Sequence, residues 1–158
     1  MEYLDVIDEN DQVIDKKTRK VVHEKRLRHR TVMFFVVSPE GKILVTKRSD
    51  NKDFFPGYWS IVLGGHVKSG ETYEEALITE MNEEINTVGG YEKLGEFVKD
   101  IKEELEHVNL YKVKVEPDEI DLLDKEFQKG EFWTEEKIKS KINELDFLPE
   151  TEGVIKYL

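Results

Sequence analysis

The clearest alternation of hydrophobic and polar positions lies in the first half of the chain. The stretch RTVMFFVVS is rich in β-branched and aromatic residues and predicts a buried strand. The turn-forming PEGK follows, and ILVTKRS predicts the partner strand of a hairpin. The segment DNKDFFPGYW, with Pro56 and Gly57, predicts a loop, and SIVLGG predicts a short strand that runs into glycines.

Similar patterns flank this central part on both sides. YLDVIDENDQVID predicts two strands around a polar turn, and KLGEFVKDI and HVNLYKVKV alternate as strands do. GEFWTEEKIKSKINEL predicts a strand end and a helix capped by Thr134, and a last short helix is expected from near Pro149. No linker divides the chain, so we expect one domain over residues 1–158, a mixed sheet with helices packed on it.

A helix is predicted directly after the glycines. Thr72 and Glu75 form a capping-box pattern, and Asn86 before Gly89 can end the helix in the left-handed conformation. At about 100° per residue, one arc of the helix is apolar. Its members are Leu77, Ile78, Met81 and Ile85. A neighbouring arc carries three carboxylates, those of Glu80, Glu83 and Glu84.

The acidic arc admits two interpretations. The stretch from Gly64 to Asn86 contains six glutamates, and a solvated helix face can bear their repulsion of a few tenths of a kcal/mol per pair. A hard dication such as Mg²⁺ or Mn²⁺ would instead turn that repulsion into attraction. Gly64 and Gly65 allow close backbone approach to a ligand, and Gly70 permits a tight turn. The combination favours a metal site.

Composition narrows the classes of function. The 158 residues carry 35 acidic and 24 basic side chains and a formal charge of −11, which disfavours a general nucleic-acid binder. The chain has no cysteine, which excludes disulfides and thiolate chemistry. It has no signal-peptide pattern and no membrane-spanning apolar run, so a cytoplasmic protein is expected. The oligomeric state stays open.

One segment departs from the acidic composition. Residues 16–30 contain eight Lys or Arg and a single Glu. The segment is either a solvated helix or loop, or a positively charged wall for an anionic substrate. The sequence does not decide between these interpretations.

The stretch from Gly65 onward resembles the Nudix hydrolase family, whose pattern is G-x5-E-x7-R-E-U-x-E-E-x-G-U with U a bulky apolar residue. The matching positions are Gly65, Glu71, Glu80, Met81, Glu83 and Glu84. The resemblance implies an α/β/α sandwich around a mixed β-sheet. It also implies hydrolysis of a diphosphate bond in a nucleoside diphosphate derivative, with Mg²⁺ or Mn²⁺ as cofactor and no nucleic-acid or membrane partner.

The resemblance also assigns roles to these residues. Glu80, Glu83 and Glu84 would hold the metal, with the Gly65 carbonyl as a further ligand, and Glu71 would shape the loop. The catalytic candidates are Glu71, Glu83 and Glu84, and the choice of general base among them stays open. Two positions depart from the pattern. Thr79 replaces an arginine expected to brace the motif by charge-assisted hydrogen bonds, and Asn86 replaces the last glycine.

A second, narrower resemblance is to the Nudix branch that includes isopentenyl-diphosphate isomerase. That isomerase binds a metal through histidines and glutamates and uses a cysteine before a Gly-His pair. The positions that match its metal ligands are His23, His29, His66, Glu104 and Glu106. Gly64 stands at the cysteine position, which argues against isomerisation. The alternative for the histidines is a structural, hydrogen-bonded role.

Other residues near the loop are candidates for substrate contact. Arg48 and Lys52 can meet phosphates, together with the backbone at Gly64 and Gly65, or can be ordinary surface. Four aromatic side chains can stack on a base or simply pack, namely Phe54, Phe55, Tyr58 and Trp133. Three functions stay open: a metal-dependent diphosphate hydrolase, which we favour, an isomerase, and a nucleotide-binding domain without catalysis.

Overall fold

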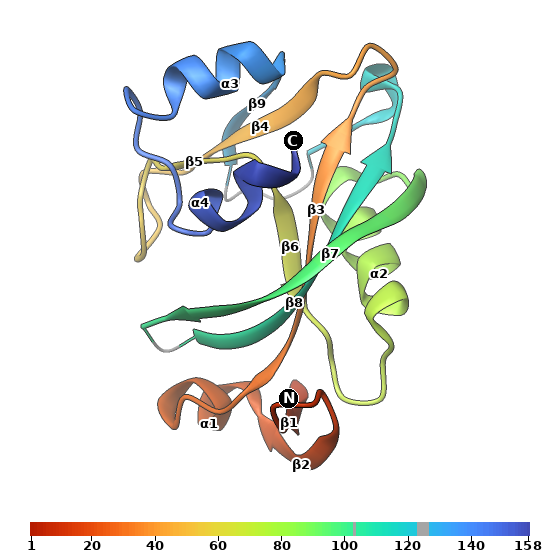
Figure 1. The fold of residues 1–158 in the computed structure, drawn as a ribbon, viewed down its shortest axis with the longest axis vertical. Helices are drawn as coiled ribbons and strands as arrows, with labels where there is room; N and C mark the ends of the chain where they lie inside the picture. The colour runs from red at the N-terminus through yellow and green to blue at the C-terminus, as the bar shows by residue number, and fades with distance from the viewer. Residues whose placement is uncertain (103, 123–126) are drawn as a thin grey trace.

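The computed structural model describes residues 1–102, 104–122 and 127–158. Within these residues the strands form a two-stranded sheet, β1 (Tyr3–Ile7) with β2 (Val13–Thr18), and a seven-stranded sheet (Figure 1). The strands of the large sheet are β3 (His29–Val37), β4 (Ile43–Arg48), β5 (Trp59–Ser60), β6 (Leu63–His66), β7 (Gly90–Ile101), β8 (Glu104–Lys114) and β9 (Phe127–Trp133). The order is β5-β4-β3-β8-β7, with β6 paired to β3 and β9 to β4.

The large sheet is mixed, as predicted. β3 and β8 run parallel with His29 opposite Glu106, whereas the other pairs are antiparallel. The predicted hairpin of β3 and β4 is reduced to a single pair, Val37 with Ile43. The reason is that β3 already pairs along its length with β6 and β8, and β4 turns away to pair with β9. The predicted strand SIVLGG is likewise split into β5 and β6.

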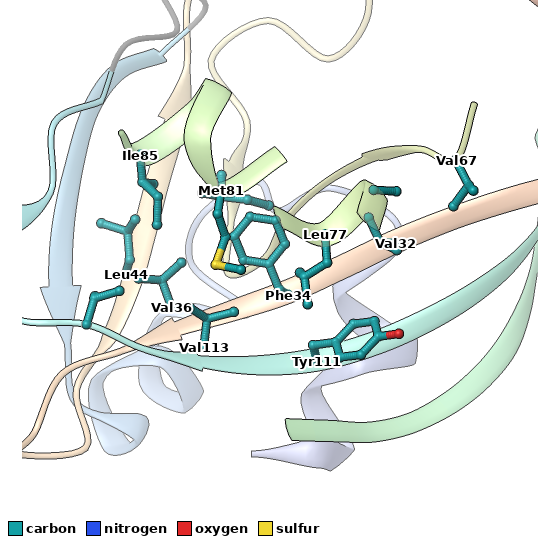
Figure 2. Close-up of a cluster of buried hydrophobic side chains, with 13 residues drawn as sticks. Val32, Phe34, Val36, Leu44, Val67, Leu77, Met81, Ile85, Tyr111 and Val113 are labelled. Carbon is teal, nitrogen blue, oxygen red and sulfur yellow. The ribbon is translucent and has the colours of Figure 1, made fainter. Parts of the chain in front are cut away.

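Helices cover both faces of the large sheet, and this arrangement confirms the sandwich. The helices are α1 (Arg19–Glu24), α2 (Tyr73–Ile85), α3 (Glu135–Lys141) and α4 (Thr151–Val154), with 3₁₀ turns at Pro117–Glu119 and Ile155–Tyr157. Alternate residues of β3 feed two cores. Val32, Phe34 and Val36 face α2, as Figure 2 shows, while Met33, Phe35 and Val37 join the core with α3 and α4.

Helix α2 confirms most of its predicted details. Thr72 Oγ1 accepts from the Glu75 N–H at 3.1 Å, Glu75 Oε1 accepts from the Thr72 N–H at 3.2 Å, and Asn86 is left-handed. The predicted burial of Ile78 is wrong, because its side chain is 38% exposed. The buried arc is turned toward Ala76 instead. On the glutamate side of the helix, Glu80 and Glu84 are half-buried, while Glu83 is exposed.

A small unit precedes the sandwich at the N-terminal end. β1, β2 and α1 lie together at one end of the molecule in Figure 1. Leu4, Val6 and Val22 form a buried cluster of their own within this unit. The predicted strand, turn and strand at the start of the chain are confirmed. Among the described residues, no helix combines the length and apolar character needed to cross a bilayer.

Candidate metal and diphosphate cleft

The glycine pair lies where other parts of the chain approach the backbone closely. On β6, Gly64 pairs with Met33 and Gly65 with Val32. A Cβ at Gly64 would lie 2.3 Å from the Val32 carbonyl oxygen, and a Cβ at Gly65 would lie 2.2 Å from Glu80 Oε1. Both glycines are therefore required by close contacts. The second contact places the Gly65 backbone directly against a carboxylate of α2.

A cleft of about 960 Å³ opens beside this contact. It brings together the three glutamates of the acidic arc with Gly64 and Gly65. Basic side chains line other parts of the same cleft, namely Arg19, Arg48, Lys52, Lys68, Lys99 and Lys102. Carboxylates that could hold a metal and cations suited to phosphates thus line one cavity.

Glu80 has the most perturbed environment of the acidic arc. Burial, reinforced by the nearby Glu83 carboxylate and opposed by Lys68, raises the pKa of Glu80 to about 7. A bound cation would reverse this effect, because it would favour the ionised form. Oxygen donors and closely spaced negative charge fit Mg²⁺ or Mn²⁺. The three carboxylates nevertheless do not converge as tightly as the histidines described below, within the residues that the structure describes.

Glu71 lies outside the lining of the cleft and belongs to the loop itself. Its Oε1 accepts a hydrogen bond from the Lys68 N–H at 2.8 Å, and its own N–H donates to the Lys68 carbonyl at 3.0 Å. Gly70 between them has a φ of +86°, a conformation that other residues rarely adopt. These contacts close the loop that leads into α2, and they support a shaping role for Glu71.

The predicted substrate contacts divide into two groups. Arg48, Lys52, Phe54 and Phe55 line the cleft, and Arg48 Nη2 donates to the Phe54 carbonyl at 3.1 Å. Tyr58 packs on Phe55, with ring centroids 5.1 Å apart. The suggestion that Trp133 stacks on a ligand is wrong. Its side chain is 4% exposed and packs on Trp59, since β9 directs it into the second core.

The basic segment, residues 16–30, agrees in part with each of its two interpretations, a solvated surface and a positively charged wall of the cleft. Arg19 and His23 on α1 line the cleft. Other bases form ion pairs at the surface, such as Lys20 with Glu24 at 3.9 Å. Arg30 instead binds Asp11 within the fold. The segment is therefore not a continuous positive wall.

Three histidines meet on the wall opposite α2. His23, His29 and His66 each offer a ring nitrogen, and these atoms lie within 4.8 Å of one another. His29 Nδ1 donates to the Leu27 carbonyl at 2.8 Å, which directs its Nε2 toward Glu106. His23 Nε2 is buried and has no hydrogen-bond partner among the described residues. A structural role explains His29 but leaves His23 unexplained.

Glu106 anchors this histidine cluster. Its Oε2 accepts from Thr31 Oγ1 at 2.8 Å and lies 3.2 Å from His29 Nε2 and 3.3 Å from His66 Nε2. Burial favours the neutral acid, but hydrogen bonds with His29 and His66 and the charge of Lys99 outweigh it and lower the pKa of Glu106. The pKa of His23 is lowered by burial and by the neighbouring histidines. Imidazole nitrogens grouped beside a carboxylate could serve as metal ligands.

Lys99 and Glu150 are among the charged residues of the cleft that the sequence did not single out. Lys99 Nζ lies 2.6 Å from Glu104, 3.7 Å from Glu106 and 3.9 Å from Glu150. The three carboxylates raise the pKa of Lys99 against the opposing effect of burial. Lys99 has an ordinary place in an alternating strand, and Glu150 lies in the C-terminal segment. Nothing local in the sequence marks either residue.

Comparisons with known proteins follow this geometry. The NUDIX domain model matches residues 27–152. An uncharacterized Nudix hydrolase of Nostoc sp. is 45% identical over 54% of the chain and 52% of its own length. Another, from Clostridium acetobutylicum, is 29% identical over 98% of the chain and 94% of its own length. The chain thus spans about half the length of several curated relatives and nearly all of one.

Solved structures agree on the fold. A crystal structure from Deinococcus radiodurans superposes with a TM-score of 0.82 at 24% identity and covers 98% of both chains. The NUDIX domain of NrtR from Shewanella oneidensis, complexed with ADP ribose, has a TM-score of 0.62 at 14% identity over 80% of this chain and 83% of its own. The mixed sheet, the glycine loop with its glutamate helix, and the matched domain lead to one conclusion: the chain belongs to the Nudix family.

Proposed function

We propose that the chain is a divalent-metal-dependent hydrolase that cleaves the diphosphate bond of a nucleoside diphosphate derivative. The observation that carries this proposal is the cleft that Glu80, Glu83 and Glu84 line together with several basic side chains, with Glu80 against the Gly65 backbone. A carboxylate face can hold a hard cation while the bases receive the phosphates. The ADP ribose bound to the NUDIX domain of NrtR supports a nucleoside diphosphate as the ligand class.

The residues divide the work as follows. Glu80, Glu83, Glu84 and the Gly65 carbonyl would hold Mg²⁺ or Mn²⁺, which supplies charge neutralisation and a more acidic water. Arg48 and Lys52 orient the diphosphate from the other side of the cleft.

In the reaction, a water attacks one phosphorus and the bridging P–O bond breaks. The proton of the water passes to a cleft carboxylate, with Glu83 and Glu84 the nearest candidates on the motif. Glu71 acts on the shape of the loop.

Phe54 and Phe55 are the proposed contacts for the base. Both line the cleft, and the Phe54 side chain is 63% exposed on the loop before β5. An exposed aromatic face beside a phosphate site can stack on a nucleobase. The proposed ligand is therefore a small molecule.

The experiment is a panel of diphosphates, assayed for release of phosphate or nucleotide with and without Mg²⁺. We expect metal-dependent cleavage of at least one nucleoside diphosphate derivative. Metal-dependent ligand binding with no turnover across the panel would instead identify a binding domain, the alternative raised by Thr79. Phe54→Ala should raise KM for a nucleotide substrate more than for inorganic diphosphate, because only the nucleotide has a base to stack.

The histidine cluster supports a second candidate, an isomerase-like reaction on a diphosphate such as isopentenyl diphosphate. Imidazole nitrogens with a carboxylate suit first-row transition metals, and His23 and His66 open into the same cleft as the glutamates. Gly64 opposes this candidate. A cysteine there would place its Cβ 2.3 Å from the Val32 carbonyl oxygen. A product of unchanged mass from isopentenyl diphosphate would favour the isomerase.

A further inference from the structure

The N-terminal unit of β1, β2 and α1 contacts the glycine loop, residues 67–72 between β6 and α2. This unit lies outside residues 27–152, which the family model matches. Leu4 nevertheless forms an antiparallel bridge with Lys68, and the Ser69 N–H donates to the Tyr3 carbonyl at 2.9 Å. β1 therefore extends along the loop as an additional short strand. The loop that leads to Glu71 is held by a part of the chain that is remote in sequence.

Asp5 on β1 makes the strongest side-chain contacts with this loop. Its Oδ1 accepts from Ser69 Oγ at 2.7 Å, and its Oδ2 accepts from the Gly70 N–H at 3.3 Å. Gly70 is the left-handed residue directly before Glu71. A carboxylate that accepts from two consecutive residues fixes both their position and the turn between them.

Asp11, in the turn between β1 and β2, holds the other side of Glu71. Its Oδ2 accepts from the hydroxyl of Tyr73 at 3.0 Å, and Tyr73 is the first residue of α2. Its Oδ1 and carbonyl oxygen accept from Arg30 Nε and Nη2, each at 2.7 Å. The Arg30 guanidinium also lies over the Tyr73 ring, 5.5 Å from its centroid. Asp11 thus ties the start of α2 to the start of β3.

These contacts bear on the departure at Thr79. The family pattern has an arginine there, which would brace the glutamates from within the motif. Thr79 has no charge and a short side chain, so it cannot reach or pair as arginine does. The two aspartates instead fix the loop and the helix start on both sides of Glu71. The motif arginine would hold this segment from within α2, whereas the aspartates hold it from β1 and from the turn after β1.

We propose that Asp5 and Asp11 are positioning residues for the metal site and perform the bracing that the motif arginine would otherwise provide. This inference rests on the proposed metal-dependent function. By fixing the loop and the first turn of α2, they keep the Gly65 carbonyl in register with the carboxylates of the helix. Neither aspartate lines the cleft. Their effect is therefore on the position of the metal ligands, and it should be measurable as a change in metal affinity.

The test measures Mn²⁺ binding by calorimetry in the full chain, without substrate, alongside the thermal unfolding midpoint. Asp5→Ala should weaken Mn²⁺ binding by roughly tenfold or more, as for other residues that orient metal ligands. Asp5→Asn should bind nearly as the unaltered chain does, because its amide can accept from the Gly70 N–H and donate to the Ser69 hydroxyl. Retained binding in Asp5→Asn therefore separates hydrogen bonding from charge.

Asp15→Ala is the matched control in the same N-terminal unit. The exposed Asp15 carboxylate on β2 accepts from the Lys16 N–H at 2.7 Å and lies 3.6 Å from Lys17 Nζ, away from the loop and from Asp11. Asp15→Ala should leave Mn²⁺ affinity unchanged. Equal loss of affinity in Asp5→Ala and Asp15→Ala, or no loss in Asp5→Ala, overturns the proposal.

Two further variants test the Asp11–Tyr73 hydrogen bond and the effect of an arginine at position 79. Tyr73→Phe keeps the ring but removes the hydroxyl that binds Asp11, and should weaken Mn²⁺ binding by a smaller factor than Asp5→Ala. Adding Thr79→Arg to Asp5→Ala should recover affinity, and failure to recover any would contradict the substitution of one brace for the other. If the unaltered chain binds no Mn²⁺, the hydrolase proposal fails and this inference with it.

Discussion

The two walls of the cleft differ in chemistry and in how the chain builds them. On one wall, a single helix presents three carboxylates from neighbouring turns. On the other, His23 and His66 line the cleft from α1 and β6, and the buried His29 and Glu106 of β3 and β8 lie against them. The first wall offers oxygen donors that could hold a hard cation, and the second offers imidazole nitrogens that suit a transition metal. The cleft is therefore lined by two kinds of candidate metal ligand with different preferences.

The comparison also shows which kind of site can be predicted from sequence. Helix α2 was predictable because its capping box, its wheel and its glutamates lie within one segment. The histidine cluster depends on β3 pairing with β6, which brings His66 near His29, and with β8, which adds Glu106, and periodicity carries no information on these pairings. Only the resemblance to a known branch singled out its members.

Three gaps in the sequence analysis have equally local explanations. Ile78 was placed in the core because the wheel gives the width of an apolar arc but not its rotation toward the sheet. For Trp133 both stacking and packing stayed open, because its orientation on β9 depends on pairing with β4. Lys99 was missed because its three carboxylate neighbours come from distant parts of the chain.

The largest expected effect is a loss of hydrolysis when the carboxylate wall is altered. Glu83→Gln and Glu84→Gln should each lower Mg²⁺-dependent hydrolysis by about 10²–10³-fold, because each removes a negative charge from the face proposed to hold the cation. Steady-state rates on the substrate found in the panel check this. Glu74→Gln on the same helix is the control and should change the rate little, since among the described residues Glu74 accepts a hydrogen bond only from the Tyr111 hydroxyl, at 3.4 Å. Unchanged rates in both motif variants would mean that the site lies elsewhere.

A smaller effect is expected from the backbone beneath the carboxylates. Gly65→Ala places a Cβ 2.2 Å from the present position of Glu80 Oε1, so the carboxylate must move away. Mn²⁺ affinity should fall by roughly 10–100-fold, measured by calorimetry. Gly153→Ala, whose Cβ would have an ordinary 3.8 Å contact with Phe97, should leave the affinity unchanged. Equal affinities for both variants would show that Glu80 is not a ligand.

Acidity should affect the carboxylate wall over a defined pH range. Since the pKa of Glu80 is raised to about 7 without a cation, metal binding must displace a proton below that pH. Mn²⁺ affinity should fall by up to about tenfold per pH unit as pH drops below 7, with proton release that calorimetry in two buffers detects. The same raised pKa means that Glu80 destabilises the metal-free fold as pH rises from 4.5 through 7. A flat affinity between pH 6 and 8 would contradict this role.

The smallest effect on hydrolysis is expected from the second wall. His23→Ala should leave the Mg²⁺-dependent rate nearly unchanged, because the proposed hydrolysis gives His23 no role in holding Mg²⁺ or in proton transfer. It should nevertheless abolish Co²⁺ binding at the histidine cluster, which visible absorption spectroscopy follows. Glu83→Gln should show the opposite pattern, with Co²⁺ binding retained and hydrolysis lost. A loss of hydrolysis in His23→Ala as large as in Glu83→Gln would mean that both walls act as one centre.

The parallel pairing of β3 with β8 has a consequence for the order of folding. His29 and Glu106 are 77 positions apart, so their contact closes a long loop, whereas α2 and the β7–β8 hairpin need only neighbouring residues. During refolding, the glutamate helix can form early, while the histidine cluster exists only after the central strands have joined. Binding of Co²⁺ by the cluster would then report completion of the sheet, later than any helical signal.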